Sequence, residues 1–323
     1  MIDRLEMLIA LAREGHFGRA AESLNISQPS LSAGIRTLEE HLGVQLVHRS
    51  SRYGGLTPEG QSALVWAQRI VADARQLREE MRATRHGLAG ELRLAVIPTA
   101  LTLAARLAAA MTARHPRLRL SVLSRSAREI NGMIESFDAD AGISYLDGEP
   151  AGRALRVALY EESYVLVCTR ASPFAGRAVV GWNELGEARL ALMTPDMQNR
   201  RIINRIFADH GLTPRPEIES NAHITLIASA AEGQCMTIIP REIARSAAVG
   251  PNLVLVPLEG AGAAHRVGLI LPDRDPRTPV LDALLAEARR IADGAGHAGS
   301  APLPPARKGD QIAPRQGRKA GTT

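Results

Sequence analysis

Apolar residues recur at helical spacing through the first 42 residues and predict three short helices. The first spans residues 3–14 and ends at Gly15, a residue type that often closes helices. A turn at Asn25-Ile26 separates the second helix from the third. Ser27 is a good N-cap for the third helix, and Pro29 lies in its first turn, where it removes no hydrogen bond. The apolar residues expected to face the core are Ala20, Ala21, Leu24, Leu31, Ile35, Leu38 and Leu42.

The other face of the third helix is polar. A helix that buries one side and presents short polar donors near its N-terminus suits the major groove of DNA. Residues 44–47 then have strand character, a glycine-rich turn follows, and residues 56–57 return, so we expect a short hairpin, or wing. Arginines in such a wing contact phosphate or the minor groove, whereas most exposed arginines are only solvated. The predicted DNA-contacting residues are Ser27, Gln28, Pro29, Ser30, Ser32, Arg36, Arg49 and Arg52.

A long helix is predicted from Thr57 to about Arg85. Its apolar positions, from Ala63 to Leu88, repeat in alternating steps of four and three, which is a heptad seam. Packing of a single amphipathic helix on its own domain is the alternative, but the length and the period favour an intermolecular pair. Such a pair holds two DNA-reading domains at a fixed spacing. The predicted dimerisation residues are Ile70, Ala74, Leu77 and Met81.

From residue 91 onward, strand and helix patterns alternate, which predicts an α/β architecture. The expected strands are 92–97, 118–123, 140–144, 164–168, 190–193, 217–220, 236–239 and 267–271. The expected helices are 100–114, 127–136, 197–210, 223–233 and 279–293. This order is typical of parallel sheets with helices on both faces, divided into two subdomains with a cleft between them. Ligands of open α/β sheets bind outside the carboxyl ends of the strands.

The net charge of the chain adds little support to DNA binding. The formal net charge is +5, but the segment from residue 296 carries +4 of it, and residues 1–60 are net −1. Only the placement of particular arginines therefore supports DNA binding. The last residues, 294–323, have almost no large apolar side chain, so we expect a disordered tail, for which weak phosphate binding is the alternative role.

Few other classes of protein fit the sequence. No apolar run reaches the roughly 20 residues that cross a bilayer, and the N-terminus lacks a signal-peptide pattern, so we expect a cytoplasmic protein without a membrane partner. Cys168 and Cys235 are far apart and are interpreted as small buried hydrophobes. No metal-ligand spacing, cofactor motif, nucleophile elbow or phosphate loop occurs, so we expect no metal, no cofactor and no enzyme. An enzyme or a solute-binding protein built on the α/β part, and an architectural DNA binder without a ligand, are the alternatives.

The N-terminal pattern resembles that of the LysR-type transcriptional regulators. The matching residues are Phe17, Ala20, Ala21, Leu24, Ser27, Gln28, Pro29, Ser32, Ile35, Leu38, Glu39, Leu42, Gly43, Leu46, Arg49, Thr57 and Gly60. The match is dense over about 50 residues, and the plan of the family extends over residues 1–293. Ala33-Gly34 stands where many members carry longer polar residues, so base reading should rest more on Gln28, Ser30, Ser32 and Arg36.

The resemblance implies a multidomain bacterial regulator. It implies a winged helix-turn-helix at 1–58, a dimerising linker helix and hinge at 59–90, and an effector-binding domain similar to periplasmic binding proteins at 91–293. Lobe I of that domain should span about 91–161 and 268–293, and lobe II about 162–267. Family members usually form homotetramers from two homodimers, bind palindromic sites in double-stranded promoter DNA, and change DNA bending when a small molecule occupies the cleft.

The resemblance also places the effector. The residues that correspond to the cleft of the family are Thr99, Ser124, Ser126, Met197, Gln198 and Asn221. Because several of these open helices, whose N-termini attract anions, a small anion is the expected guest; simple helix caps are the alternative role of the hydroxyl side chains. The runs 194–203 and 32–35 resemble a subgroup found beside formate dehydrogenase operons, which would make the effector formate or a similar small carboxylate.

Overall fold

The N-terminal helices form as the pattern predicts. The computed structural model describes residues 1–48, 53–147, 154–246, 250, 252–260, 265–273 and 276–296. It begins with α1 (Ile2–Glu14), α2 (Phe17–Ser23) and α3 (Gln28–Leu42). Gly15 ends α1 in the left-handed conformation, with φ of 59°. Leu31, Ile35 and Leu38 are buried, but Leu42, the last residue of α3, is 46% exposed, so its expected place in the core is wrong.

The long helix α4 (Pro58–His86) follows the segment where the wing is expected. The expected strand at 44–47 is reduced to one antiparallel bridge between Val47 and Leu56, beside a hydrogen bond from His48 N to Gly55 O at 3.0 Å. At the start of α4, a Cβ on Gly60 would overlap the carbonyl oxygen of Leu46, so only glycine lets the helix pass so close to the wing.

The first five-stranded sheet, called lobe I, has the order β2-β1-β3-β10-β4. Its strands are β1 (Ala89–Val96), β2 (Arg117–Ser124), β3 (Ala141–Tyr145), β4 (Ala154–Glu162) and β10 (His265–Pro272). Its helical segments are η1 (Pro98–Ala100), α5 (Leu101–Arg114), α6 (Ala127–Glu135) and α10 (Pro279–Gly296). β1 pairs in parallel with β2 and β3, but β10 is antiparallel to both β3 and β4. The sheet is therefore mixed and not parallel as expected, because β4 and β10 are the strands by which the chain leaves lobe I and returns to it.

The second sheet, called lobe II, has the order β7-β6-β8-β5-β9 and is also mixed. Its strands are β5 (Tyr164–Thr169), β6 (Leu190–Met193), β7 (Ile218–Ser220), β8 (Met236–Pro240) and β9 (Leu253–Pro257). Its helical segments are η2 (Trp182–Leu185), α7 (Gln198–Asp209), α8 (His223–Ala231) and α9 (Arg241–Ser246). The sequence pattern did not predict β4, β9 or α9.

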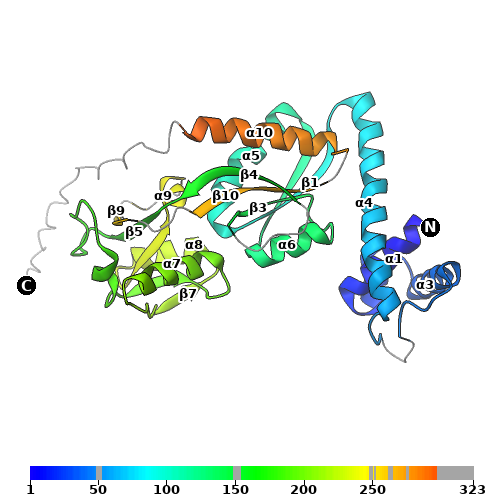
Figure 1. Cartoon of the computed structure of the whole chain (residues 1–323), viewed down its shortest axis with the longest axis horizontal. Helices are drawn as coiled ribbons and strands as arrows, with labels where there is room; N and C mark the ends of the chain where they lie inside the picture. The colour runs from blue at the N-terminus through cyan, green and yellow to red at the C-terminus, as the bar shows by residue number, and fades with distance from the viewer. Residues whose placement is uncertain are drawn as a thin grey trace, which may run out of the picture.

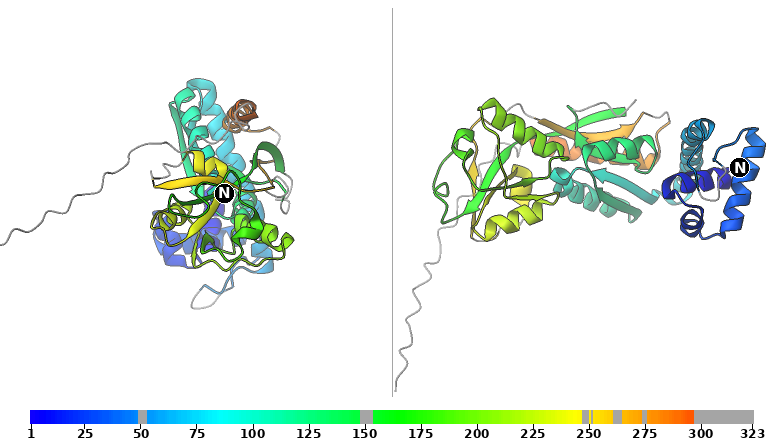
Figure 2. Two further views of the ribbon diagram at one scale, coloured as in Figure 1. Left: turned by 90° about the vertical axis from the view of Figure 1, so that its left-hand side faces the viewer. Right: turned by 90° about the horizontal axis from the view of Figure 1, so that it is seen from below.

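The chain is elongated. The three N-terminal helices and lobe II lie at opposite ends, and lobe I lies between them, joined to the N-terminal helices by α4 (Figures 1 and 2). α10 extends to Gly296, past the expected end at residue 293, and the rest of the expected tail lies outside the described residues. No helix in the described part of the chain is long and apolar enough to cross a membrane.

Candidate functional site

The N-terminal turn of α3 faces outward. Ser27 caps the helix by accepting a hydrogen bond from Ser30 N at 3.2 Å, and the two hydroxyl groups lie 2.8 Å apart. Gln28, Ser30 and Arg36 are exposed, and Ser32 is half-buried at the edge of the packed face. The exposed edge therefore carries donors and acceptors suited to base edges and phosphates. Gly34 has a packing role besides, because a Cβ there would overlap the sulfur atom of Met7 in α1.

A buried carboxylate connects α3 to the wing. Glu39, which is 7% exposed, accepts hydrogen bonds through Oε1 from Leu46 N at 2.8 Å and Val47 N at 3.2 Å. Thr57 continues this frame, because its hydroxyl donates to Gln45 O at 2.6 Å and accepts from Gly60 N at 2.9 Å. The base of the wing is thus fixed relative to α3. The predicted phosphate-contacting residues Arg49 and Arg52 lie outside the described residues, so their role stays a prediction.

α4 has two different apolar surfaces. Near its start, Ala67 is fully buried and Ala63 packs beside it in the core of the N-terminal helices, so these two seam residues serve their own domain. Ala74 is half-buried. A second surface is solvent-exposed and consists of Val65, Trp66, Ile70, Leu77 and Met81, with exposed fractions between 42% and 64%. Three of the four predicted dimerisation residues are in this exposed stripe, and the sequence pattern missed Trp66 and Val65.

A small cavity lies between the lobes. Its lining comes from the end of β1, α6 and β3 in lobe I and from β6 and α7 in lobe II, namely Ile97, Pro98, Thr99, Ser126, Ala127, Tyr145, Met193, Met197, Gln198 and Asn199. Four predicted effector residues, Thr99, Ser126, Met197 and Gln198, line this cavity. Ser124 and Asn221 are exposed and do not line it. The free volume is about 10 Å³, room for one water molecule.

The two helices that begin at this cavity, α6 and α7, differ in how their first turns are capped. Ser126 forms a complete capping box with Glu129 at the start of α6, so its hydroxyl already has two partners. At the start of α7 the N-cap is Met197, and no side chain of the described residues caps that turn. The first turn of α7 is therefore the end with free backbone N–H groups.

Beside the cavity, one carboxyl group joins the lobes. Glu162, the last residue of β4, is 3% exposed. Its Oε1 accepts hydrogen bonds from Tyr145 Oη in lobe I at 2.7 Å and from Tyr164 Oη in lobe II at 2.6 Å. Thr99 Oγ1 lies 3.5 Å from Tyr145 Oη, and Asn199 Nδ2 donates to Tyr164 Oη at 3.4 Å. Burial raises the pKa of Glu162 and raises the pKa values of both tyrosines well above their usual value.

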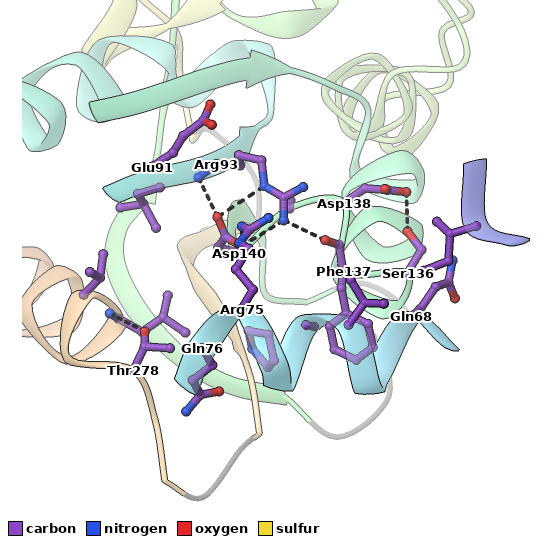
Figure 3. A pocket seen from close by; sticks show the side chains of 18 of the residues that line it. Gln68, Arg75, Gln76, Glu91, Arg93, Ser136, Phe137, Asp138, Asp140 and Thr278 are labelled. Carbon is purple, nitrogen blue, oxygen red and sulfur yellow. Dashed lines mark hydrogen bonds and ion pairs between the residues drawn. The ribbon is translucent and has the colours of Figure 1, made fainter. Parts of the chain in front are cut away.

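A larger cavity of about 210 Å³ lies where α1, α4 and lobe I meet. Figure 3 shows Asp140 between two arginines at this junction. Asp140 accepts from Arg75 Nη2 of α4 at 2.9 Å, and it accepts from Arg93 N at 2.7 Å and Arg93 Nη2 at 3.0 Å. Nearby, Gln76 Nε2 donates to Pro276 O at 2.8 Å. These bonds attach the linker helix to lobe I.

Two family models together match nearly all of the described chain. Residues 2–61 match the bacterial regulatory helix-turn-helix protein, lysR family, and residues 85–293 match the LysR substrate binding domain. The chain belongs to the LysR family of bacterial transcriptional regulators. It is thus a DNA-binding regulator with an effector-binding domain, as the resemblance implied.

Individual members of the LysR family are distant in sequence. The regulator CbbR of Rhodospirillum rubrum is 26% identical over 290 residues, covering 90% of this chain and 96% of its own length. OxyR of Escherichia coli is 25% identical over 291 residues, covering 90% of this chain and 95% of its own length. Among solved structures, full-length OxyR of Pseudomonas aeruginosa has a TM-score of 0.71 at 25% identity, covering 90% of this chain and 97% of that one. Full-length CbnR in complex with its target DNA has a TM-score of 0.63 at 23% identity, covering 90% of this chain and 99% of that one.

Neither metal nor thiol chemistry is supported at the cavity between the lobes. No group of three His, Cys, Asp or Glu residues that could hold a metal ion occurs within the described ranges. Cys168 and Cys235 are buried, and neither lines the cavity. Burial raises the pKa of both thiols, which disfavours the reactive thiolate.

Proposed function

We propose that this LysR-family regulator reads promoter DNA through the N-terminal turn of α3 and responds to a small molecule bound between lobes I and II. The observation that supports DNA reading is the edge of α3 that carries Gln28, Ser30, Ser32 and Arg36, on a helix that Glu39 joins to the base of the wing. Arg49 and Arg52 would add phosphate contacts beside it. An enzyme is the weaker alternative, because the Ser126 hydroxyl, which lines the cavity and lies beside the Glu129 carboxylate, is engaged in the capping box of α6.

Assembly would pass through α4. The exposed stripe of Trp66, Ile70, Leu77 and Met81 extends along a helix that the N-terminal core covers only near its start. Large exposed apolar side chains in one stripe are typical of an interface, and pairing of two copies would bury them. The resulting homodimer would present two α3 helices to a palindromic site, and two such dimers would form the tetramer usual in the family. We propose that residues 1–58 form the DNA-binding domain, residues 59–90 the dimerising linker helix and hinge, and residues 91–293 the effector-binding domain.

The effector would bind with its charged end at α7. Free N–H groups of the first turn of α7 favour a carboxylate, and formate is the simplest candidate. Because Glu162 fastens lobe I to lobe II, a ligand in the cavity would change the angle between the lobes. The bonds of Asp140 and Gln76 would pass that change to α4, and so to the spacing of the two α3 helices and the bend of the DNA.

DNase I footprinting on the DNA upstream of the gene that encodes this chain tests the proposal. The wild-type protein should protect two half-sites, and Gln28→Ala should lose that protection while retaining binding to random DNA. Addition of small carboxylates should extend or shorten the protected region. Protection without any sequence preference, or a footprint that no carboxylate changes, would contradict the proposal.

A further inference from the structure

The hydrogen bonds around Glu162 all point in one direction. Both phenol groups donate their protons to Glu162 Oε1, so each phenol oxygen is left as an acceptor. Asn199 Nδ2 therefore donates to Tyr164, and the Thr99 hydroxyl is placed to donate to Tyr145. The donors thus form two chains, from Asn199 through Tyr164 and from Thr99 through Tyr145, and both chains end at Glu162 Oε1.

Two acceptors remain without a partner. Glu162 Oε2 and Asn199 Oδ1 are buried and have no hydrogen-bond partner among the described residues. Asn199 is 2% exposed and lines the cavity between the lobes, as do Thr99 and Tyr145, which belong to the same network. A buried acceptor without a donor costs free energy, so both oxygen atoms favour a guest that supplies a donor.

The charges beside the cavity limit the guest further. No Arg, Lys, His, Asp or Glu is among the described residues that line it, and the acidic group of the network, the carboxyl of Glu162, is hydrogen-bonded to the lining residue Tyr145. A simple anion would find no cationic side chain in this lining, would depend on the N-terminus of α7, and would lie near the carboxyl group of Glu162. A carboxylate that also carries a donor would supply partners both to the first turn of α7 and to the unpartnered acceptors.

We infer that the effector of this chain is a small carboxylate that also carries a hydroxyl or ammonium group, and that Glu162 and Asn199 accept a hydrogen bond from that group. The inference rests on the proposed function, which assigns the effector to this cavity. The carboxylate binds at the first turn of α7, and the donor replaces a missing partner of Glu162 Oε2 and Asn199 Oδ1. Since the present free volume is about 10 Å³, the lobes separate to admit the guest, and its donor then competes for the carboxyl group that holds them together.

Matched ligands test the donor requirement. Titration calorimetry of the full-length protein would compare formate, acetate, glycolate and glycine. Glycolate and glycine each add one donor to acetate, as a hydroxyl and an ammonium group. At least one of them should bind about tenfold more tightly than acetate, because a site built for a donor rejects an analogue that lacks it. Which of the two binds more tightly distinguishes the hydroxyl from the ammonium.

Matched variants test the residues. Glu162→Gln replaces an acceptor by a donor at nearly constant size and should reduce the preference for the donor-bearing ligand about tenfold, while Glu161→Gln, at the exposed neighbouring position, should not. Asn199→Ala provides the same test if Glu162→Gln does not fold, as thermal unfolding without ligand would show. Equal binding of acetate and both donor-bearing acids, an unchanged preference in both cavity variants, or no binding of any of the four acids would overturn the inference.

Footprinting separates this inference from the proposed function. If acids change the footprint without any preference for a donor, the proposed function stands and the inference fails. If glycolate or glycine binds through Glu162 and the footprint never changes, the inference stands and the proposed function fails.

Discussion

Replacing Glu39 with alanine should detach the wing from α3. The substitution removes the one carboxylate that accepts hydrogen bonds from Leu46 N at 2.8 Å and Val47 N at 3.2 Å. Both residues are at most 5% exposed, so water does not readily replace the lost acceptor. Losing charge-assisted bonds to two buried N–H groups should lower the local free energy of unfolding by about 3 kcal/mol. Glu39→Gln keeps an oxygen acceptor and should cost about 1 kcal/mol.

Amide hydrogen exchange measures this effect directly. The segment 44–48 should exchange roughly 100-fold faster in Glu39→Ala than in the wild type, since each 1.4 kcal/mol is about a factor of ten. Binding to random-sequence DNA should weaken as well, because the wing carries the predicted phosphate contacts. Glu40→Ala, at the exposed neighbouring position on α3, is the matched control and should behave like the wild type. Unchanged exchange in Glu39→Ala would refute the structural role of the carboxylate.

Three further predictions concern base reading, pairing and pH. Gln28→Ala should cost about 1–3 kcal/mol of discrimination between the promoter site and random DNA in gel-shift titrations, and an equal loss on both DNAs would contradict base reading. Leu77→Asp combined with Met81→Asp should weaken self-association at least about 100-fold by light scattering, since burying each side chain in a pair contributes about 1.5–3 kcal/mol; Arg78→Asp is the control. Burial lowers the pKa of His223 to about 4 from 6.5, so its neutral form stabilises the fold above pH 6.5 and this stability is lost as the pH falls toward 4. Between pH 7 and pH 4, the free energy of unfolding measured with denaturant should fall by about 3 kcal/mol less in His223→Phe than in the wild type. Identical pH profiles of the two proteins would contradict this.

The local elements were predictable where short-range rules determine them. Ser27 and Pro29 mark the start of α3, and Gly15 and Gly43 end α1 and α3 in the left-handed conformation, so sequence alone placed the helix-turn-helix. β4 was missed because its sequence mixes apolar residues with Arg156, Glu161 and Glu162 and shows no clear period. A strand that connects two lobes has a different environment at each end, and no single period describes it.

The cavity between the lobes was only half predictable. Thr99, Ser126, Met197 and Gln198 follow from their positions at strand ends and helix starts. The network joins Glu162 and Tyr164, which are two residues apart, to Tyr145 in β3, 17 residues before Glu162, and to Asn199 in α7, 35 residues after Tyr164, so no spacing rule reveals it. The available signal was one acidic residue, Glu162, two residues before the start of the apolar strand β5, and it became informative only once its burial was known.

The seam of α4 is a second place where the sequence pattern predicted the element but not its contacts. The heptad pattern correctly predicted one long helix, but it assigned Ala63 and Ala67 to the same seam as Leu77 and Met81. In the structure, the alanines pack against the N-terminal helices, and the larger side chains are exposed. A period identifies a face of a helix, but it does not say which partner covers each part of that face.

Ligand-dependent DNA bending is the measurement that tests the central claim most directly. Circularly permuted promoter fragments bound by the full-length protein would report the bend angle with and without small carboxylates. The account predicts that a carboxylate changes the bend angle in the wild type, and that Glu162→Gln alters this response without abolishing DNA binding. A bend angle that stays the same with every carboxylate, while the protein still binds its promoter, would contradict the coupling of the cavity between the lobes to α3.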